Sequence, residues 1–226
     1  MHEEVPALAW FGPQAQAGIA EAHQGGLPFH VLSQEQAVPF AAGKALWLKL
    51  RVQATLGGTA GWQLEVAVPV VGRITVYQQD ASGRWLARTA GVTVPMREWP
   101  RPGRYPSFDL QLRPGAATEV FVEVRHSTPL SLPLRVLTAD AHLRQGQIEY
   151  MALGLALGAL ALLLAASLLR AWRLRDPLYG WYALHAFVAM LALAAFTGVA
   201  AHLFWGNAGE WVDGAPGWLA LLAAAL

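Results

Sequence analysis

The sequence predicts an antiparallel β-sandwich or barrel followed by transmembrane α-helices. Apolar and polar residues alternate between about residue 29 and residue 137, a pattern typical of half-buried strands. Two long stretches beyond residue 150 carry no charge, as membrane-spanning helices require. Only 14% of the 226 residues are charged, against about 25% in ordinary globular domains. Because just six charged residues follow Tyr150, the two regions belong in different solvents.

We divide the chain into three parts. Residues 1–28 are rich in Ala, Gln and Gly and form a lead-in segment, for which we expect a strand and a loop. Residues 29–147 form the sandwich, and residues 148–226 form the membrane region. No signal peptide is readable at the start, and the end falls within an apolar run, so we expect a fragment of a longer protein.

Six segments of the sandwich region read as strands: LWLKLRVQ, WQLEVAV, RITVYQQ, SFDLQL, TEVFVEV and LPLRVL. Turn signals separate several of them, namely LGGTAG at 56–61, DASG at 80–83 and RPGA at 113–116. Short strands at regular spacing, with no helical period between them, indicate a sandwich or barrel. The residues expected to face the core are Leu46, Leu48, Leu50, Val52, Leu64, Val66, Val68, Ile74, Val76, Phe108, Leu110, Leu112, Val120, Val122, Val124, Leu132, Leu134 and Val136.

Two apolar stretches are long enough to cross a bilayer. Residues 150–169 would make a helix of roughly 30 Å, the thickness of the hydrocarbon core. Residues 178–205 are longer and have aromatic residues at both ends, as expected at membrane interfaces. A third run, residues 217–226, is too short to cross and predicts only the start of another span.

Loop charges predict the orientation. Arg170, Arg173 and Arg175 lie between the first two spans, whereas the next loop, GNAGEWVDGAP, has two acidic residues and no Lys or Arg. The positive-inside rule makes these arginines topology determinants and places residues 170–177 in the cytoplasm. The sandwich then lies outside, which in a bacterium means the periplasm beyond the inner membrane.

Several segments resemble the bacterial seven-transmembrane receptors with diverse intracellular signalling modules (7TMR-DISM). They are the junction QIEYMALGLALG, the loop LRDPLYGWYALH, and TEVFVEVRHSTPLSLPLRVLTADAH, with WLKLRV and LEVAVPVVGRITVYQQD resembling earlier strands of the second extracellular domain type. The resemblance covers residues 46–226. It implies a jelly-roll sandwich that binds a carbohydrate-like or other small ligand, a seven-helix bundle, and a cytoplasmic output domain of the histidine kinase or diguanylate cyclase type.

Catalytic signatures are absent from the sequence. It has no Cys, and its seven His residues do not have the spacing of a metal site, so we expect neither metal nor cofactor and do not expect this chain to be an enzyme. The near-neutral charge of +1, without a basic stripe, argues against nucleic acid as a partner. Glu119 and Glu123 alternate outward on one predicted strand, and a solvated face explains them.

Two sets of residues are candidates for ligand binding. The proline-rich loop PMREWPRPGRYPSF, 95–108, holds Arg97, Trp99, Arg101, Arg104 and Tyr105, whose aromatic faces and guanidinium groups suit sugar rings, hydroxyls and carboxylates. The alternative is a stiff, soluble loop. The second set, Trp47, Lys49 and Arg51, shares one strand face; the alternative is that Trp47 packs under a loop while the two cations are solvated.

The sequence therefore predicts the ligand-sensing input portion of a membrane receptor. The expected partners are a small ligand, with carbohydrate as one class, and the lipid bilayer; a homodimer or a hybrid receptor partner is open. The alternative is a carbohydrate-binding module of a membrane-anchored periplasmic enzyme or transport accessory protein. A third reading is an adhesion module that binds another protein.

Overall fold

The computed structural model describes residues 7–13, 18–32, 40, 43–53, 61–112, 115–200 and 211–225. It divides into two compact units, Met1–His142 and Leu143–Leu226. The predicted turn at 56–61, apart from Gly61, and residues 201–210, which hold the first part of the acidic loop, lie outside the described residues, as do residues 113–114 of the RPGA turn.

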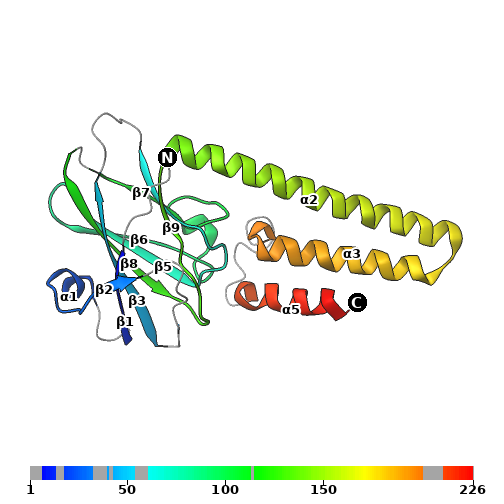
Figure 1. Ribbon diagram of the computed structural model, residues 1–226, viewed down its shortest axis with the longest axis horizontal. Coiled ribbons are helices and arrows are strands. Elements are labelled where there is room, and N and C mark those ends of the chain that lie inside the picture. Colours follow the sequence, from blue (N-terminus) through cyan, green and yellow to red (C-terminus); the bar gives the residue numbers. More distant parts are fainter. Residues whose placement is uncertain are drawn as a thin grey trace. The chain divides into compact units, whose positions relative to one another are not determined.

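Two antiparallel sheets make up the first unit (Figure 1). One sheet has six strands in the order β2-β1-β3-β8-β5-β6, and the other has three in the order β7-β4-β9. The sandwich predicted from the alternating pattern is thus confirmed. The strands are β1 (Ala7–Pro13), β2 (His30–Leu32), β3 (Lys44–Gln53), β4 (Trp62–Val66), β5 (Arg73–Gln79), β6 (Trp85–Ala90), β7 (Ser107–Leu110), β8 (Ala117–Arg125) and β9 (Leu134–Thr138).

The main core lies between the inner faces of the two sheets. Alternate residues of each strand point inward, because successive side chains of a strand face opposite sides. All the residues predicted to face the core belong to its buried cluster except Leu112, which is partly buried against it. Period-2 alternation was therefore a reliable guide to the inner faces.

The lead-in segment contributes to the sandwich. Strand β1 pairs with β3 along its whole length, from Ala7 opposite Leu50 to Pro13 opposite Lys44. The short helix α1 (Ile19–His23) follows it and packs on the outer face of the six-stranded sheet, where Ala22 and Leu27 join a second buried cluster with Trp47 and Phe121. The strand expected in residues 1–28 is β1, and it belongs to the six-stranded sheet.

The second unit is helical. Helix α2 (Ala139–Leu174) has 36 residues, α3 (Pro177–Phe196) has 20, and α5 (Trp211–Ala225) has 15. Figure 1 shows the three helices lying side by side, and Leu157, Ala194 and Leu219 pack together from α2, α3 and α5. Both α2 and α3 are long and apolar enough to cross a membrane, which agrees with the predicted fold class.

Helix α2 begins 11 residues before the predicted span, at Ala139 rather than residue 150. The segment ADAHLRQGQIE contains no proline and is rich in helix-forming residues, so nothing interrupts the helix. The Thr138 hydroxyl accepts a hydrogen bond from the Ala141 amide at 3.3 Å, as a helix N-cap does. The last strand therefore leads directly into one continuous helix.

Two residues separate α2 from α3. Arg175 adopts a left-handed conformation with φ of 51°, and Asp176 then caps α3 by accepting a hydrogen bond from the Leu178 amide at 2.9 Å. Pro177 occupies the first turn of α3, where no backbone donor is needed. Arg170 and Arg173 lie on the last turns of α2, and the Arg170 guanidinium lies 5.9 Å from the Tyr179 ring centroid.

Candidate functional site

A pocket of about 530 Å³ opens at one end of the six-stranded sheet. Segments far apart in the sequence surround it: α1, the β5–β6 turn, the residue after β7, and the start of β8. Its volume is within the usual range for small-molecule sites. The lining residues are His23, Gln79, Asp80, Ala81, Ser82, Gly83, Trp85, Gln111, Ala116, Ala117, Thr118 and Glu119.

The β5–β6 turn is held by Asp80. One carboxylate oxygen, Oδ1, accepts hydrogen bonds from the Ser82 amide at 2.8 Å, the Ser82 hydroxyl at 2.6 Å and the Arg84 amide at 3.0 Å. The other, Oδ2, accepts from the Arg84 guanidinium. The Ser82 hydroxyl, with these amides and the guanidinium, lowers the pKa of Asp80 to about 2. Gly83, at φ of 81°, supplies the left-handed conformation that completes the turn.

Gln78 positions another part of the pocket lining, Gln111. Its buried carboxamide donates to the Gln111 main-chain oxygen at 2.7 Å and accepts from the Gln111 amide at 3.0 Å. This pair of bonds fixes the backbone of Gln111, which lines the pocket. Gln79, the next residue on β5, faces the outer side of the sheet and lines the pocket as well.

Trp85 forms the aromatic part of the pocket. It lies opposite Gln79 in the β5–β6 pairing. Its ring makes edge contacts with Phe121, at 5.6 Å between centroids, and with His23 of α1, at 5.1 Å. These contacts hold a half-buried indole beside the carboxamides and hydroxyls, a combination that can bind one apolar and one hydrogen-bonding side of a small molecule.

Glu119 connects the pocket to one of the predicted sets. It lines the pocket and forms an ion pair with Lys49 at 2.9 Å. Lys49 also lies 5.5 Å from the Phe121 ring centroid. Arg51 is exposed and lies directly opposite Glu119 in the β3–β8 pairing. The pocket carboxylate is therefore already paired with a cation from β3.

Trp47, the third member of that set, is fully buried at 0% exposure. It stacks on Tyr77 with centroids 5.4 Å apart and an interplanar angle of 19°. Helix α1 and the residues after it cover this part of the sheet. This packing under a covering segment is the alternative to ligand binding for Trp47.

Glu123, which we expected on a solvated face, is buried beneath the same aromatic layer. It accepts a hydrogen bond from the Tyr77 hydroxyl at 3.0 Å and pairs with Arg125. Burial of Tyr77, together with the charge of Glu123, raises the pKa of the phenol to about 12. The Tyr77 phenol and the Arg125 guanidinium cover this carboxylate, and the strand pattern alone could not reveal these contacts.

The loop set forms contacts within its own chain. Trp99 is 6% exposed, belongs to the main core, and donates from Nε1 to the Val94 carbonyl at 3.0 Å. Arg101 pairs with Asp109 at 2.7 Å. Arg97 is largely exposed and lies 3.8 Å from the Glu98 carboxylate.

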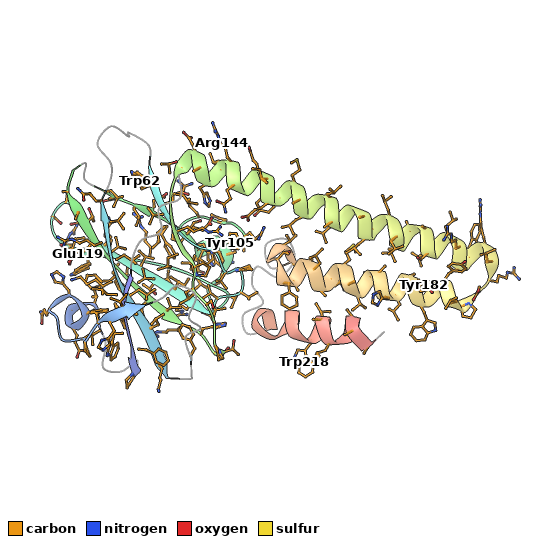
Figure 2. The ribbon with its side chains drawn as sticks, viewed as in Figure 1. Trp62, Tyr105, Glu119, Arg144, Tyr182 and Trp218 are labelled. Carbon is orange, nitrogen blue, oxygen red and sulfur yellow. The ribbon has the colours of Figure 1, made fainter. Side chains whose placement is uncertain are left out.

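Arg104 and Tyr105 form a pair of their own. The Arg104 guanidinium lies over the Tyr105 ring, 4.4 Å from its centroid, and donates a hydrogen bond to the Tyr105 hydroxyl. Figure 2 shows Tyr105 and the pocket residue Glu119 on opposite sides of the sandwich unit. The structure therefore does not bring the two predicted sets together, and ligand binding by either remains a prediction.

Sequence reasoning missed most of the pocket. It recognised DASG at 80–83 as a turn, but nothing in the pattern indicated that Gln79, Gln111 and Thr118 would meet beside it. These residues lie at the end of β5, just after β7 and in β8. The sequence around each of them has an ordinary composition. The only available signal was the turn itself.

Comparisons with known proteins give two family matches. Residues 9–138 match the model described as 7TMR-DISM extracellular 2, and residues 149–226 match 7TM diverse intracellular signalling. No curated protein matches the chain. The enzymatically active domain of tailspike protein 4 from bacteriophage CBA120 matches 58% of this chain with 14% identity and a TM-score of 0.26, and the chain spans 18% of that structure. A similarity of that size carries no argument.

Proposed function

Because the chain belongs to the seven-transmembrane receptors with diverse intracellular signalling modules, we propose that its sandwich unit senses a small ligand outside the bacterial inner membrane. The family's extracellular and transmembrane domains make it a membrane sensor receptor with an outside-facing N-terminal domain. The predicted resemblance is confirmed, and the family match begins at residue 9, earlier than the motifs that suggested it.

The pocket beside the β5–β6 turn is the observation that supports ligand sensing. Its two carboxylates already have partners, Asp80 within its turn and Glu119 with Lys49. A ligand would therefore meet hydrogen-bonding groups rather than a free charge. Carboxamides and hydroxyls next to an indole suit a neutral molecule with several hydroxyl groups. We propose a carbohydrate-like ligand on this basis.

The membrane helices would relay the bound state. A ligand shifts a receptor only if it binds two conformations with different affinity. Helix α2 continues from the last strand of the sandwich without a break, so a change in that strand acts on the helix that enters the membrane. We propose that this chain senses and relays without catalysis, and that the relay reaches a cytoplasmic output domain of the histidine kinase or diguanylate cyclase type.

Thermal unfolding of the whole chain in detergent tests the ligand class. Glucose, galactose, maltose and cellobiose serve as neutral probes, with glucuronate, glucosamine and inorganic phosphate as charged ones. We expect a neutral sugar to raise the melting temperature because a ligand that binds only the folded state stabilises it. Gln79→Ala should abolish the rise, since it removes a pocket carboxamide from an exposed position.

Arg97→Ala is the matched control, because Arg97 is an exposed residue of the loop set. It should leave the rise intact. A rise that Arg97→Ala abolishes and Gln79→Ala preserves would transfer the site to the loop. If only charged probes raise the melting temperature, the neutral class is wrong, and if no probe does, sensing of these small molecules is contradicted.

A further inference from the structure

A buried carboxylate lies on the outer face of the three-stranded sheet. Glu65 of β4 is 4% exposed and has Ser107 of β7 and Arg135 of β9 as its cross-strand neighbours. Gln63, two residues earlier on the same face, is 1% exposed. A charged group in such a place is costly unless charges or hydrogen bonds compensate for the lost water.

His142, on the first turn of α2, contacts Glu65. Its Nδ1 lies 2.9 Å from Glu65 Oε2, and its side chain is about three-quarters buried. Among the described residues, neither His142 Nδ1 nor Glu65 Oε1 has an aligned hydrogen bond. Because the two groups are close but poorly aligned, their attraction depends on charge more than on a directed hydrogen bond. His142 carries that charge only when it is protonated.

Three other charged groups lie near this contact, and each leaves the Glu65 oxygen Oε2 to His142. Arg135 of β9 lies 3.7 Å from the other carboxylate oxygen of Glu65. Asp109 of β7, which shares the outer face through its pairing with Gln63, is held by Arg101 at 2.7 Å. Asp140 lies exposed on the same helical turn as His142.

We propose that Glu65 and His142 form a proton-dependent latch that fixes the first turn of α2 to the three-stranded sheet. Protonation of His142 creates an ion pair with the buried carboxylate and tightens the turn against β4. Loss of the proton leaves a near contact without a directed bond and loosens the turn. The latch thereby makes the start of the membrane-entering helix sensitive to the pH outside the membrane. It does not depend on the ligand pocket.

Hydrogen exchange of the whole chain in detergent micelles tests the latch. Amides of residues 139–146 are followed at about pH 5.5 and about pH 8, on either side of the usual histidine range, with rates corrected for the intrinsic pH dependence of exchange. We expect roughly tenfold slower corrected exchange at the lower pH, the effect of gaining one charge-assisted contact. Amides of β3 and β8 report whether the sandwich is folded.

Glu65→Gln and His142→Gln should each remove the pH difference, while Asp140→Asn, a charge change on the same turn, should preserve it. His142→Gln alters a partly exposed helical residue and keeps the test decisive if Glu65→Gln fails to fold. The proposal is overturned if the unmodified chain shows no pH difference, or if the difference persists in folded His142→Gln. A difference abolished equally by Asp140→Asn would assign it to general helix charge and overturn the latch as well.

Discussion

The loop at 95–108 and the pocket beside the β5–β6 turn differ in how their polar groups are used. The arginines and aromatic residues of the loop suggest a ligand-binding site, yet Trp99 lies in the core and Arg101 is paired with Asp109. The pocket has less conspicuous chemistry, and its carboxamides come from separate strands. A run of polar and aromatic residues in the sequence shows which functional groups are present. The contacts that these groups make within the chain determine which of them a ligand can still bind.

The two sites also differ in what holds them in place. Trp99 anchors the loop by burial of an indole and one hydrogen bond. The pocket is held by hydrogen bonds, those of Gln78 to the Gln111 backbone and those of Asp80 within its turn. If this contrast is right, substitutions in the loop should change stability alone, whereas substitutions at the pocket should change binding, with or without a loss of stability.

Trp99→Ala should produce the largest effect. Removal of a buried indole from the core leaves a cavity and should lower the free energy of unfolding by about 4 kcal/mol. Urea unfolding of the chain in detergent, followed by the near-ultraviolet dichroism of the sandwich, measures the loss. Any ligand bound at the pocket should still bind the fraction that remains folded.

Arg101→Ala is the control on the same loop. Its ion pair with Asp109 is half exposed, so its removal should cost less than about 1 kcal/mol and less still at high salt. Equal losses for Trp99→Ala and Arg101→Ala would refute the view that burial of the indole anchors the loop.

Gln78→Ala comes next in size and addresses the pocket. It leaves the Gln111 amide and carbonyl without their partners and should cost about 2 kcal/mol. Because Gln111 then loses its fixed position, ligand affinity should fall too, by roughly tenfold for a loss of one well-placed hydrogen bond. Isothermal titration with the neutral sugar that raises the melting temperature measures the affinity.

Gln79→Ala provides the comparison one residue along β5. Its side chain is exposed, so its removal should weaken binding enough to abolish the rise in melting temperature, with a stability change within about 0.5 kcal/mol. A Gln78→Ala variant with unchanged affinity would show that the clamp on Gln111 has no part in forming the pocket.

The sequence predicted the sandwich core well because burial on one face forces a period of two. Leu46, Leu48 and Leu50 follow that rule and are fully buried between the sheets. The expectation of a solvated side chain failed for Glu123, because Tyr77 and Arg125 hold its carboxylate in a buried position on the outer face. Alternation identifies two faces of a strand, but it cannot say whether the second face is covered.

The extent of α2 shows a similar limit. Hydropathy located the apolar part of the helix because a bilayer imposes a length on uncharged residues. It could not place the start at Ala139, since the preceding residues are polar and their helical state is fixed by propensity and the Thr138 cap. The contact between Glu65 and His142 joins residues 77 positions apart, and no local sequence pattern predicts it.

Acid titration of Asp80 should give the smallest effect and the finest comparison between the two sites. Hydrogen bonds from Ser82 and Arg84 lower its pKa from 3.8 to about 2. A carboxylate with a depressed pKa contributes to the folded turn above its unfolded value, and the contribution disappears as the pH falls through the folded value. The turn should therefore keep its shape from about pH 4 upward and loosen near pH 2.

Amide shifts of Ser82 and Arg84, followed by nuclear magnetic resonance, should show a midpoint near 2 that Asp80→Asn removes. Asp109→Asn, which alters the loop's ion pair instead, should leave that midpoint in place. A midpoint at 3.8 would mean that the turn is not held by Asp80, and the hydrogen-bonded wall of the pocket would lose its main support.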